Sequence, residues 1–546
     1  MLTSTPTAPA GSTSSTQGLS LRGMTKRFGT LTACDHIDLD IVPGRIHCLL
    51  GENGAGKTTL MNLLYGLLPA DEGSISIGGV EQHFRDSRDA IDAGIGMVHQ
   101  HFMLVNVFTV AENIVLGREP GAAGLLDIRS ARANVRRLSA RYHMDVRPES
   151  VVGDLPVGVQ QRVEILKSLA NDAKYLIFDE PTAVLTPQET DDLMRIMHEL
   201  RDEGHAIVFI THKLHEVREI ADDITVIRRG RVVGKAEPGM SELALAEMMV
   251  GRSVSLTVDK PPATPGEPVL RVSNLKVADP SGAVVVNGVT FDVHAGEIVC
   301  VAGVQGNGQT ELAEALLGRV PVLEGSVKLE GADLTRARVK TAIAAGFGYV
   351  PEDRQSDGLI GKFSIAENLV LDQVESFSRF AWLDVGGILD NADKLAAEFD
   401  IRTPDVTLPA TSLSGGNQQK VVLARELSRP LKLLLASQPT RGVDVGAIEF
   451  LHARIVAERD KGTAVLIVST ELDEVEALAD RIAVMYRGKL VGIVPPDTPR
   501  DVLGLMMAGV PFEEAASIGT HPAAPTGGPP GPGGTDVPTS GEEAKA

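Results

Sequence analysis

The 546-residue chain carries the same series of motifs twice, and this duplication limits the folds that it can adopt. The run IHCLLGENGAGKTTL, starting at Ile46, corresponds to IVCVAGVQGNGQTEL, starting at Ile298, at an offset of 252 residues. Further along, LPVGVQQRVEILKSLA from Leu155 corresponds to LSGGNQQKVVLARELS from Leu413 at an offset of 258. Solenoid repeats are only about 20–50 residues long, so the much longer period here indicates two homologous domains.

Each half alternates short apolar runs with amphipathic stretches, which predicts an α/β domain with a largely parallel sheet. Buried strands are expected at Ile46–Leu50 and 174–178, and at the corresponding positions of the second half. A proline-rich segment suits a short extended linker, and both ends have the composition of disordered tails. The predicted segments are a tail at 1–17, domains at 18–252 and 268–514, a linker at 253–267 and a second tail at 515–546.

The composition excludes several classes of protein. A formal net charge of -20 argues against a nucleic-acid partner, since proteins that neutralise phosphate backbones carry a basic face. Three scattered cysteines predict neither a disulfide framework nor a zinc site, and favour a reducing cytosol. His99 and His101 flank Gln100 and would suggest a metal pair, but without a third ligand nearby they are interpreted as ordinary loop residues. No apolar run approaches the ~20 residues that span a bilayer, so any membrane role is expected to depend on partners.

GENGAGKT, at 51–58, fits the phosphate-loop pattern between a predicted strand and a predicted helix. Its glycines allow backbone N–H groups to surround the phosphates of ATP at a helix N-terminus, where the helix dipole favours anions. Lys57 adds a cation, and the Thr58 hydroxyl can bind Mg²⁺. The residues of this stretch predicted to contact ATP are Gly51, Asn53, Gly54, Gly56, Lys57, Thr58 and Thr59.

Asp179 and Glu180 follow the apolar run YLIF. A carboxylate at the end of a buried strand beside a phosphate loop can hold Mg²⁺, and the adjacent one can polarise an attacking water. An Asp-Glu pair taken alone is more often a solvated loop. Its position after a phosphate loop favours a functional interpretation.

Together with LSGGN at 413–417, five residues resemble the defining elements of ABC ATPases: Lys57 (Walker A), Gln100 (Q-loop), Asp179 and Glu180 (Walker B), and His212 (switch histidine). The resemblance covers both halves, from about residue 18 to 514. It implies two tandem ABC-type P-loop nucleotide-binding domains, each with a RecA-like α/β core and a helical subdomain. It also implies that the two domains pair head to tail, so that each ATP lies between one domain's Walker motifs and the other's signature.

The resemblance assigns further roles to individual residues. Glu180, His212 and Gln100 are expected to serve catalysis, and Mg²⁺ is expected on Thr58, Gln100 and Asp179. Phe28 stands where the family stacks an aromatic ring on adenine, although a core phenylalanine is the alternative there. The signature residues expected at the γ-phosphate are Ser414, Gly415, Gly416 and Asn417.

All departures from the family pattern fall in one of the two composite sites. The first site combines the intact Walker motifs of the first half with the intact signature of the second. The second site lacks the lysine, the Q-loop glutamine, the acidic pair and the histidine, and it faces LPVGV, in which proline replaces the signature serine. The replacing residues are Gln309, Glu352, Ser437, Gln438, Thr470 and Pro156. We therefore expect one hydrolytic site and one that hydrolyses little ATP.

Fused, asymmetric ABC ATPases of this kind resemble the importers of nucleosides and simple sugars. GMVHQHFMLVNVFTVAENIVLG (96–117) and ASQPTRGVD (436–444) most resemble the nucleoside branch, with sugars such as ribose or galactose as the alternative. A non-transport ABC ATPase acting on ribosomes or DNA fits less well, given the short linker and the acidic charge. The resemblance implies two transmembrane permease subunits, a substrate-binding lipoprotein or periplasmic protein, and a position at the cytoplasmic face of the membrane.

Overall fold

The computed structural model describes residues 18–29, 31–99, 102–122, 125–182, 185–253, 258–379 and 382–519. Gln100, His101 and the predicted N-terminal tail lie outside the described residues. Within these ranges, no helix has both the length and the apolar character needed to cross a bilayer.

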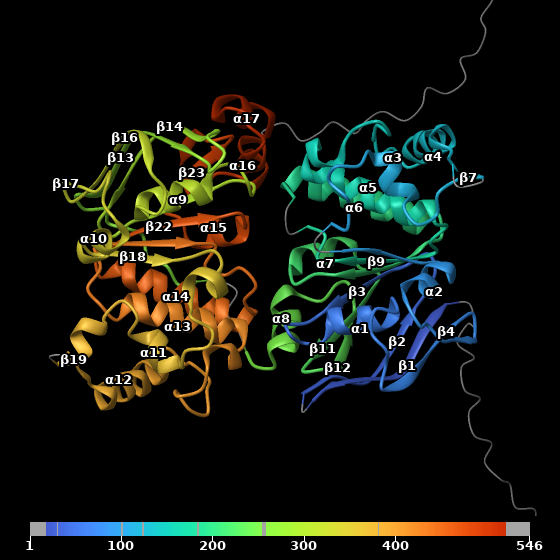
Figure 1. Ribbon diagram of the computed structural model, residues 1–546, viewed down its shortest axis with the longest axis horizontal. Coiled ribbons are helices and arrows are strands. Elements are labelled where there is room, and N and C mark those ends of the chain that lie inside the picture. Colours follow the sequence, from blue (N-terminus) through green and yellow to red (C-terminus); the bar gives the residue numbers. More distant parts are fainter. Residues whose placement is uncertain are drawn as a thin grey trace, which may run out of the picture.

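Each half contains a small antiparallel sheet, a six-stranded and mostly parallel sheet, and a helical subdomain (Figure 1). In the first half the antiparallel sheet has the order β2 (Leu31–Ile41), β1 (Leu19–Phe28), β4 (Glu72–Ile77), β5 (Val80–Gln82). The six-stranded sheet has the order β12 (Arg231–Ala236), β11 (Asp223–Arg228), β3 (Ile46–Leu50), β10 (Ala206–Ile210), β9 (Tyr175–Asp179), β6 (Ile95–Val98). The helices are α1 (Lys57–Leu64), α2 (Ser87–Asp92), α3 (Val110–Val115), α4 (Ile128–Arg141), α5 (Val157–Ala170), α6 (Pro187–Asp202), α7 (Leu214–Ile220) and α8 (Glu242–Val250).

The second half repeats this plan. Its antiparallel sheet has the order β14 (Val284–His294), β13 (Pro268–Ala278), β16 (Val322–Leu329), β17 (Ala332–Asp333). Its six-stranded sheet has the order β18 (Phe347–Val350), β21 (Leu433–Ser437), β22 (Ala464–Ser469), β15 (Ile298–Ala302), β23 (Arg481–Tyr486), β24 (Lys489–Val494). The helices are α9 (Gln309–Leu317), α10 (Val339–Ala344), α11 (Ile365–Leu369), α12 (Val385–Glu398), α13 (Gly415–Leu427), α14 (Val445–Asp460), α15 (Leu472–Leu478), α16 (Arg500–Met507) and α17 (Phe512–Gly519).

The predicted tandem α/β architecture is confirmed. Every residue of β3, β9 and β10 is buried, as expected for a parallel sheet covered on both faces. The duplication extends to single side chains: Asn113 and Asn368 are both fully buried. Each side-chain amide accepts the backbone N–H and donates to the carbonyl oxygen of one residue in the preceding loop. That residue is Val105 for Asn113 and Ile360 for Asn368. The two halves therefore fold by the same local rules.

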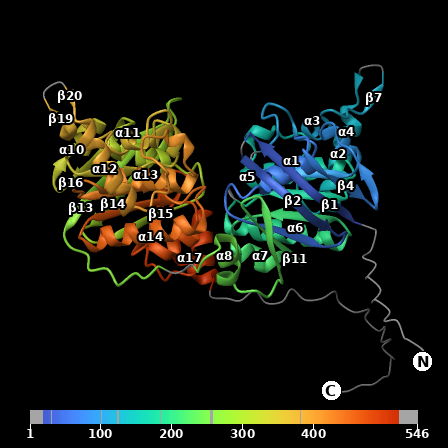
Figure 2. The same cartoon turned by 90° about the horizontal axis from the view of Figure 1, so that it is seen from below.

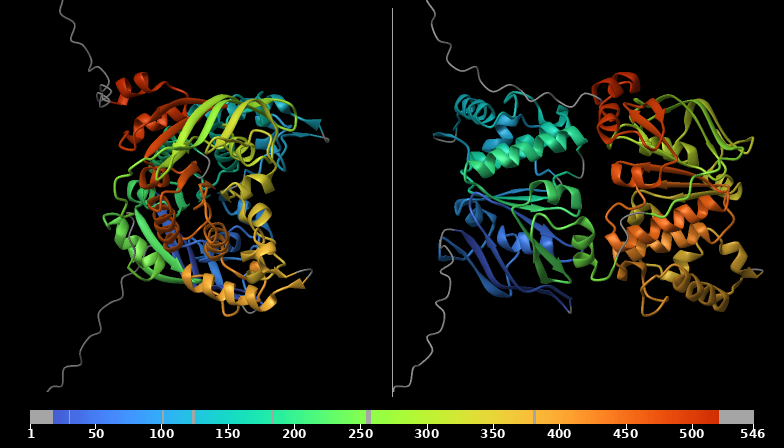
Figure 3. Two further views of the ribbon diagram at one scale, coloured as in Figure 1. Left: turned by 90° about the vertical axis from the view of Figure 1, so that its left-hand side faces the viewer. Right: turned by 180° about the vertical axis from the view of Figure 1, so that it is seen from behind.

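The halves lie side by side in opposite orientations (Figures 1 and 3). The helical subdomain of the second half (α11, α12 and α13) lies level with α1 and the antiparallel sheet of the first half. Ion pairs cross the boundary between Lys213 and Glu471 (3.2 Å) and between Arg252 and Glu449 (3.1 Å). Val445 of the second half packs against the hydrophobic core of the first.

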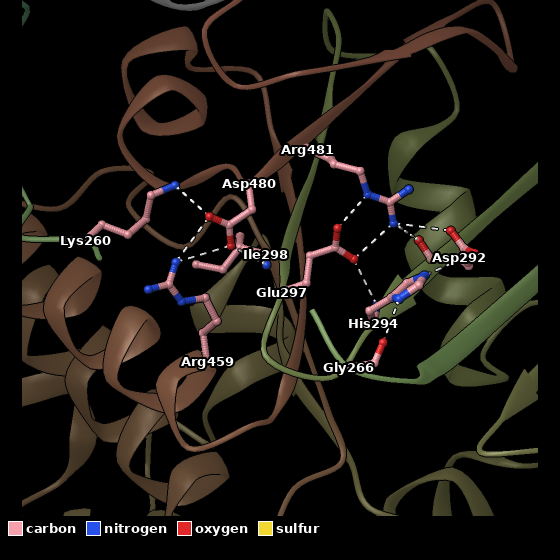
Figure 4. A network of polar contacts seen from close by, with 9 residues as sticks. All are labelled: Lys260, Gly266, Asp292, His294, Glu297, Ile298, Arg459, Asp480 and Arg481. Carbon is pink, nitrogen blue, oxygen red and sulfur yellow. Dashed lines mark hydrogen bonds and ion pairs between the residues drawn. The ribbon is translucent and has the colours of Figure 1, made fainter. Parts of the chain in front are cut away.

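Hydrogen bonds and ion pairs join the described part of the linker to the second half (Figure 4). Lys260 Nζ donates to Asp480 Oδ1 (3.0 Å) and to the carbonyl oxygen of Leu478 (3.1 Å). Arg459, which is 1% exposed, joins Asp480 to the Pro261 carbonyl oxygen (2.9 Å). Asp480 also accepts the backbone N–H of Ile298 at the start of β15. The linker is thus bound where the interior strands β15 and β23 of the six-stranded sheet begin.

The predicted start of the C-terminal tail at 515 is wrong by five residues, because α17 continues to Gly519. Ala515 is fully buried, and α17 packs on α16 and β24. Figure 2 shows α17 as part of the second half. The composition resembles a tail because the buried side chain is a small alanine among polar neighbours. The remainder of the predicted tail, from 520, lies outside the described residues.

Candidate functional site

The phosphate loop joins β3 to α1 and brings Lys57 to the first turn of the helix. Gly56 has φ 104°, and a Cβ there would collide with the Ala33 carbonyl oxygen, so this position requires glycine. Lys57 is 5% exposed, and its Nζ donates to the carbonyl oxygens of Gly51 (2.7 Å) and Glu52 (3.0 Å). Burial lowers the pKa of Lys57, although the charges of Glu180 and Asp179 oppose that shift. The ammonium group is therefore held over the loop where phosphates would bind.

Asp179 ends β9, between the parallel neighbours β6 and β10. Burial and the charge of Glu180 raise its pKa to about 6, while a hydrogen bond to Thr58 opposes the rise. The Thr58 hydroxyl and the Asp179 carboxylate are thus adjacent oxygen donors beside the phosphate loop. Mg²⁺ binds proteins through such oxygens and substrate phosphates, so the donor set fits a Mg²⁺–ATP site.

Glu180 has φ 47°, an uncommon conformation for a residue other than glycine. Its Oε1 lies 3.2 Å from Nδ1 of His212, which follows β10. Burial opposes ionisation of Glu180, but the hydrogen bond and charge of His212, together with Lys57, lower its pKa overall. Conversely, Glu180 raises the pKa of His212 against the effect of burial. The pair is therefore an ionised carboxylate held by a histidine.

A cavity of about 1650 Å³ lies between the halves and contains these groups. From the first half it is lined by Phe28, Asn53, Gly54, Gly56, Lys57, Thr58, Thr59, Glu180 and His212, among others. The second half contributes residues of the loop after β21, including Gln438, Thr440, Arg441 and Gly442. Phe28 is 47% exposed, so its ring is available to a ligand rather than packed in the core.

The predicted signature lies at the N-terminus of α13, against this same loop. Ser414 immediately precedes the helix, and the Asn417 side chain donates to its hydroxyl (3.0 Å). A Cβ on Gly416 would lie 2.7 Å from Asp444 Oδ2, so the signature glycine packs directly on Asp444. Burial and the charge of Asp444 raise the pKa of Glu52 to about 7. The charge of Asp444, in the second half, therefore acts on the phosphate loop of the first half.

The corresponding groups of the second half have other partners. Gln309 Nε2 donates to the Val304 carbonyl oxygen (3.1 Å), and Glu352 accepts from Thr310 (3.2 Å). Gln438 has φ 48°, like Glu180, and its Oε1 accepts from the Thr470 hydroxyl (3.2 Å). The backbone is preserved here, but neither member of this pair can carry charge or accept a proton as a carboxylate does. Pro156, which immediately precedes α5, likewise offers no hydroxyl.

Glu164 is a residue that sequence reasoning missed. It is 3% exposed on α5, and it accepts the backbone N–H of Met103 (2.6 Å), three residues after Gln100. Burial raises its pKa to about 7. The sequence signal was present, since Val422 occupies the corresponding position in the other half. His99 packs edge-on against the Tyr65 ring, with centroids 5.9 Å apart.

Known proteins are similar to this chain over most of its length. The ABC transporter family model matches residues 34–183 and 286–441, more than half of the chain. The nucleoside import ATP-binding protein NupA of Lactococcus lactis subsp. cremoris is 49% identical over 89% of this chain and 97% of its own length. The guanosine import ATP-binding protein NupO of Bacillus subtilis is 46% identical, over 90% and 97%. The glucose import ATP-binding protein TsgD13 of Haloferax volcanii is 46% identical, over 90% and 96%. The chain belongs to the ABC transporter family.

Proposed function

We propose that this chain is the ATP-hydrolysing subunit of a nucleoside importer and that it hydrolyses ATP at one composite site. The observation that supports this most is the contrast between two equivalent pairs. Glu180 and His212 form an ionised hydrogen-bonded pair in the cavity with Lys57, whereas Gln438 and Thr470 occupy the same positions in the other half. Only the first pair can accept a proton from water.

The chain's own residues account for each requirement of hydrolysis. Lys57 and the N–H groups at the start of α1 would bind the β- and γ-phosphates, and Phe28 would stack on the adenine. Thr58, Asp179 and Gln100 would hold Mg²⁺, which when bound neutralises phosphate charge. Glu180 would orient the attacking water and accept its proton, while His212 holds the carboxylate in position. Ser414, Gly415, Gly416 and Asn417 would approach the γ-phosphate when the halves close.

The second composite site is proposed to hydrolyse little ATP. Gln309 lacks the cation of Lys57, and charge-assisted hydrogen bonds of that kind are worth about 1.5–3 kcal/mol. Ser437 cannot replace the Mg²⁺-binding carboxylate of Asp179. Pro156 has neither a hydroxyl nor a backbone N–H to offer a phosphate.

The chain is expected to act at the cytoplasmic face of the membrane with two transmembrane permease subunits. A substrate-binding lipoprotein or periplasmic protein would deliver the transported molecule, and no nucleic acid is expected as a partner. Two relatives named for nucleoside or guanosine import support a nucleoside substrate. Simple sugars are the second candidate, because a relative of similar identity is named for glucose import.

Uptake measurements test the substrate. Cells lacking this chain should lose uptake of labelled nucleosides and keep uptake of ribose and glucose. The control is the same strain carrying the chain with Glu180→Gln, which should fail to restore uptake where the wild-type chain succeeds. Loss of sugar uptake with nucleoside uptake intact would assign the importer to the sugar branch instead.

A further inference from the structure

Three charged residues of the second half stand where the first half has uncharged ones. Glu352 corresponds to Gln100, and Arg354, two residues later, to Phe102. Arg441, in the loop after β21, corresponds to Ala183. A site that hydrolyses little ATP does not need a glutamine at position 352, but that alone does not account for three charged side chains here. Their contacts in the fold suggest a role.

The three side chains converge on one loop. Arg354 Nη1 donates to the Arg441 carbonyl oxygen (2.8 Å), and Arg354 Nη2 donates to the Gly442 carbonyl oxygen (3.2 Å). The Arg441 guanidinium forms an ion pair with Glu352. Glu352 also accepts from Thr310 (3.2 Å) and Gln305 (3.3 Å), so the carboxylate is itself fixed from two sides. Segment 352–354 therefore holds both the backbone and a side chain of loop 441–442.

Arg354 also touches the signature. A Cβ on Gly415 would lie 2.5 Å from Arg354 Nη2 and 3.1 Å from the Gly442 carbonyl oxygen. The guanidinium thus lies between the first residue of α13 and the loop after β21, with no room for a side chain at Gly415. A guanidinium is a rigid planar fork with fixed donors, which suits it to fix two backbone segments relative to one another.

Loop 441–442 lines the cavity between the two halves. Arg441 and Gly442 share this cavity with Lys57, Glu180 and His212 of the complete site, and with Gln438 and Thr470 of the degraded one. Arg354 is not among the residues that we place on ATP or on the attacking water, so it can act there only through the loop and the signature.

We propose that Arg354 is a positioning residue for ATP hydrolysis at the first composite site. Its guanidinium holds the signature and loop 441–442 as one unit, and Glu352 supports that unit through Arg441. The inference rests on the proposed assignment of hydrolysis to this site. Glu352 stands in place of the Q-loop glutamine of the second site. Through Arg441 it thereby supports the first site.

Steady-state ATP hydrolysis by the purified full chain tests this role. Arg354→Ala should lower kcat about tenfold, because small misplacements of groups around a transition state are costly. KM for ATP should stay within about threefold, because the Walker contacts that bind ATP first belong to the other half. Arg354→Lys, which keeps the charge and one donor, should recover part of the lost kcat.

The matched control is Arg319→Ala. Arg319 forms ion pairs with Asp357 (2.8 Å), in the same segment as Arg354, and with Glu314 (3.7 Å), whereas Arg354 donates to loop 441–442. This variant should keep the wild-type kcat. An equal loss of kcat in Arg319→Ala, a kcat for Arg354→Ala within about twofold of wild type, or a parallel rise in KM would overturn the proposal.

ATP turnover is also measured for two further variants, Glu352→Gln and Glu180→Gln. If Arg354→Ala does not fold, as judged by its thermal unfolding, Glu352→Gln removes the ion pair with a nearly isosteric side chain. It should lower kcat about threefold, and an unchanged kcat would overturn the proposal. Glu180→Gln is measured alongside to distinguish the two proposals. If Glu180→Gln retains ATP turnover, the assignment of hydrolysis to the first composite site is wrong. If Glu180→Gln loses turnover and Arg354→Ala does not, only the positioning role of Arg354 is wrong.

Discussion

The pairs Glu180–His212 and Gln438–Thr470 have the same backbone and different chemistry. Glu180 and Gln438 share a left-handed backbone conformation, with φ 47° and 48°, and each side chain lies 3.2 Å from a partner supplied by the next parallel strand. The two halves therefore share the backbone conformation and the side-chain geometry, but only the first half has the ionisable Glu–His pair. This contrast is what the proposed single hydrolytic site predicts.

Replacing the catalytic carboxylate should have the largest effect. Glu180→Gln should lower ATP turnover by about 10²–10⁴ and leave ATP binding intact, because it removes only the proton acceptor. Gln438 shows that glutamine is compatible with this backbone conformation, so the loss would reflect chemistry. Turnover and nucleotide binding should be measured on the same preparation, and turnover close to wild type would show that Glu180 is not the base.

Substitutions in the two phosphate loops should differ almost as strongly in their effect on ATP turnover. Lys57→Ala should lower turnover by about 10²-fold, because it removes the phosphate cation of the complete site. Gln309→Ala serves as the matched variant and should keep turnover within about threefold of wild type, since that loop already lacks the cation. Similar losses in the two variants would mean that both loops support hydrolysis.

Glu164→Gln should have a smaller effect, on thermal stability, and the effect should depend on pH. Burial raises the pKa of this carboxyl from 4.5 to about 7, so the folded state binds its proton more tightly than the unfolded state. Wild-type stability is therefore penalised progressively as pH rises through that window. Relative to wild type, the melting temperature of Glu164→Gln should increase from pH 4.5 to 7 and then level off. A difference that does not change with pH would contradict the raised pKa.

The sequence predicted the duplicated fold well, because buried parallel strands and a phosphate loop leave local signals. Lys57, Asp179 and Glu180 were assigned from such signals and His212 from the family resemblance, and the structure places Lys57, Glu180 and His212 in one cavity. Helix α17 was missed because a short segment of small and polar residues has the composition of a tail until its packing is known.

The contacts of Arg354 could not be predicted in the same way. They join segments nearly 90 residues apart, and their partners are backbone carbonyl groups that carry no residue identity. Glu164 was missed although an acidic residue in an apolar helix is visible in the sequence. Comparison with Val422, its counterpart, would have revealed it.

The pairing of one half's Walker motifs with the other half's signature is tested most directly by two arginine substitutions, each read as ATP turnover. Ser414→Arg should lower turnover by about 10²-fold, because the new side chain would occupy the place of the γ-phosphate beside Lys57. Pro156→Arg, at the corresponding position of the first half, should stay within about threefold of wild type, because it faces the site that already lacks its catalytic groups. Equal losses in the two variants, or a greater loss for Pro156→Arg, would contradict a single composite site.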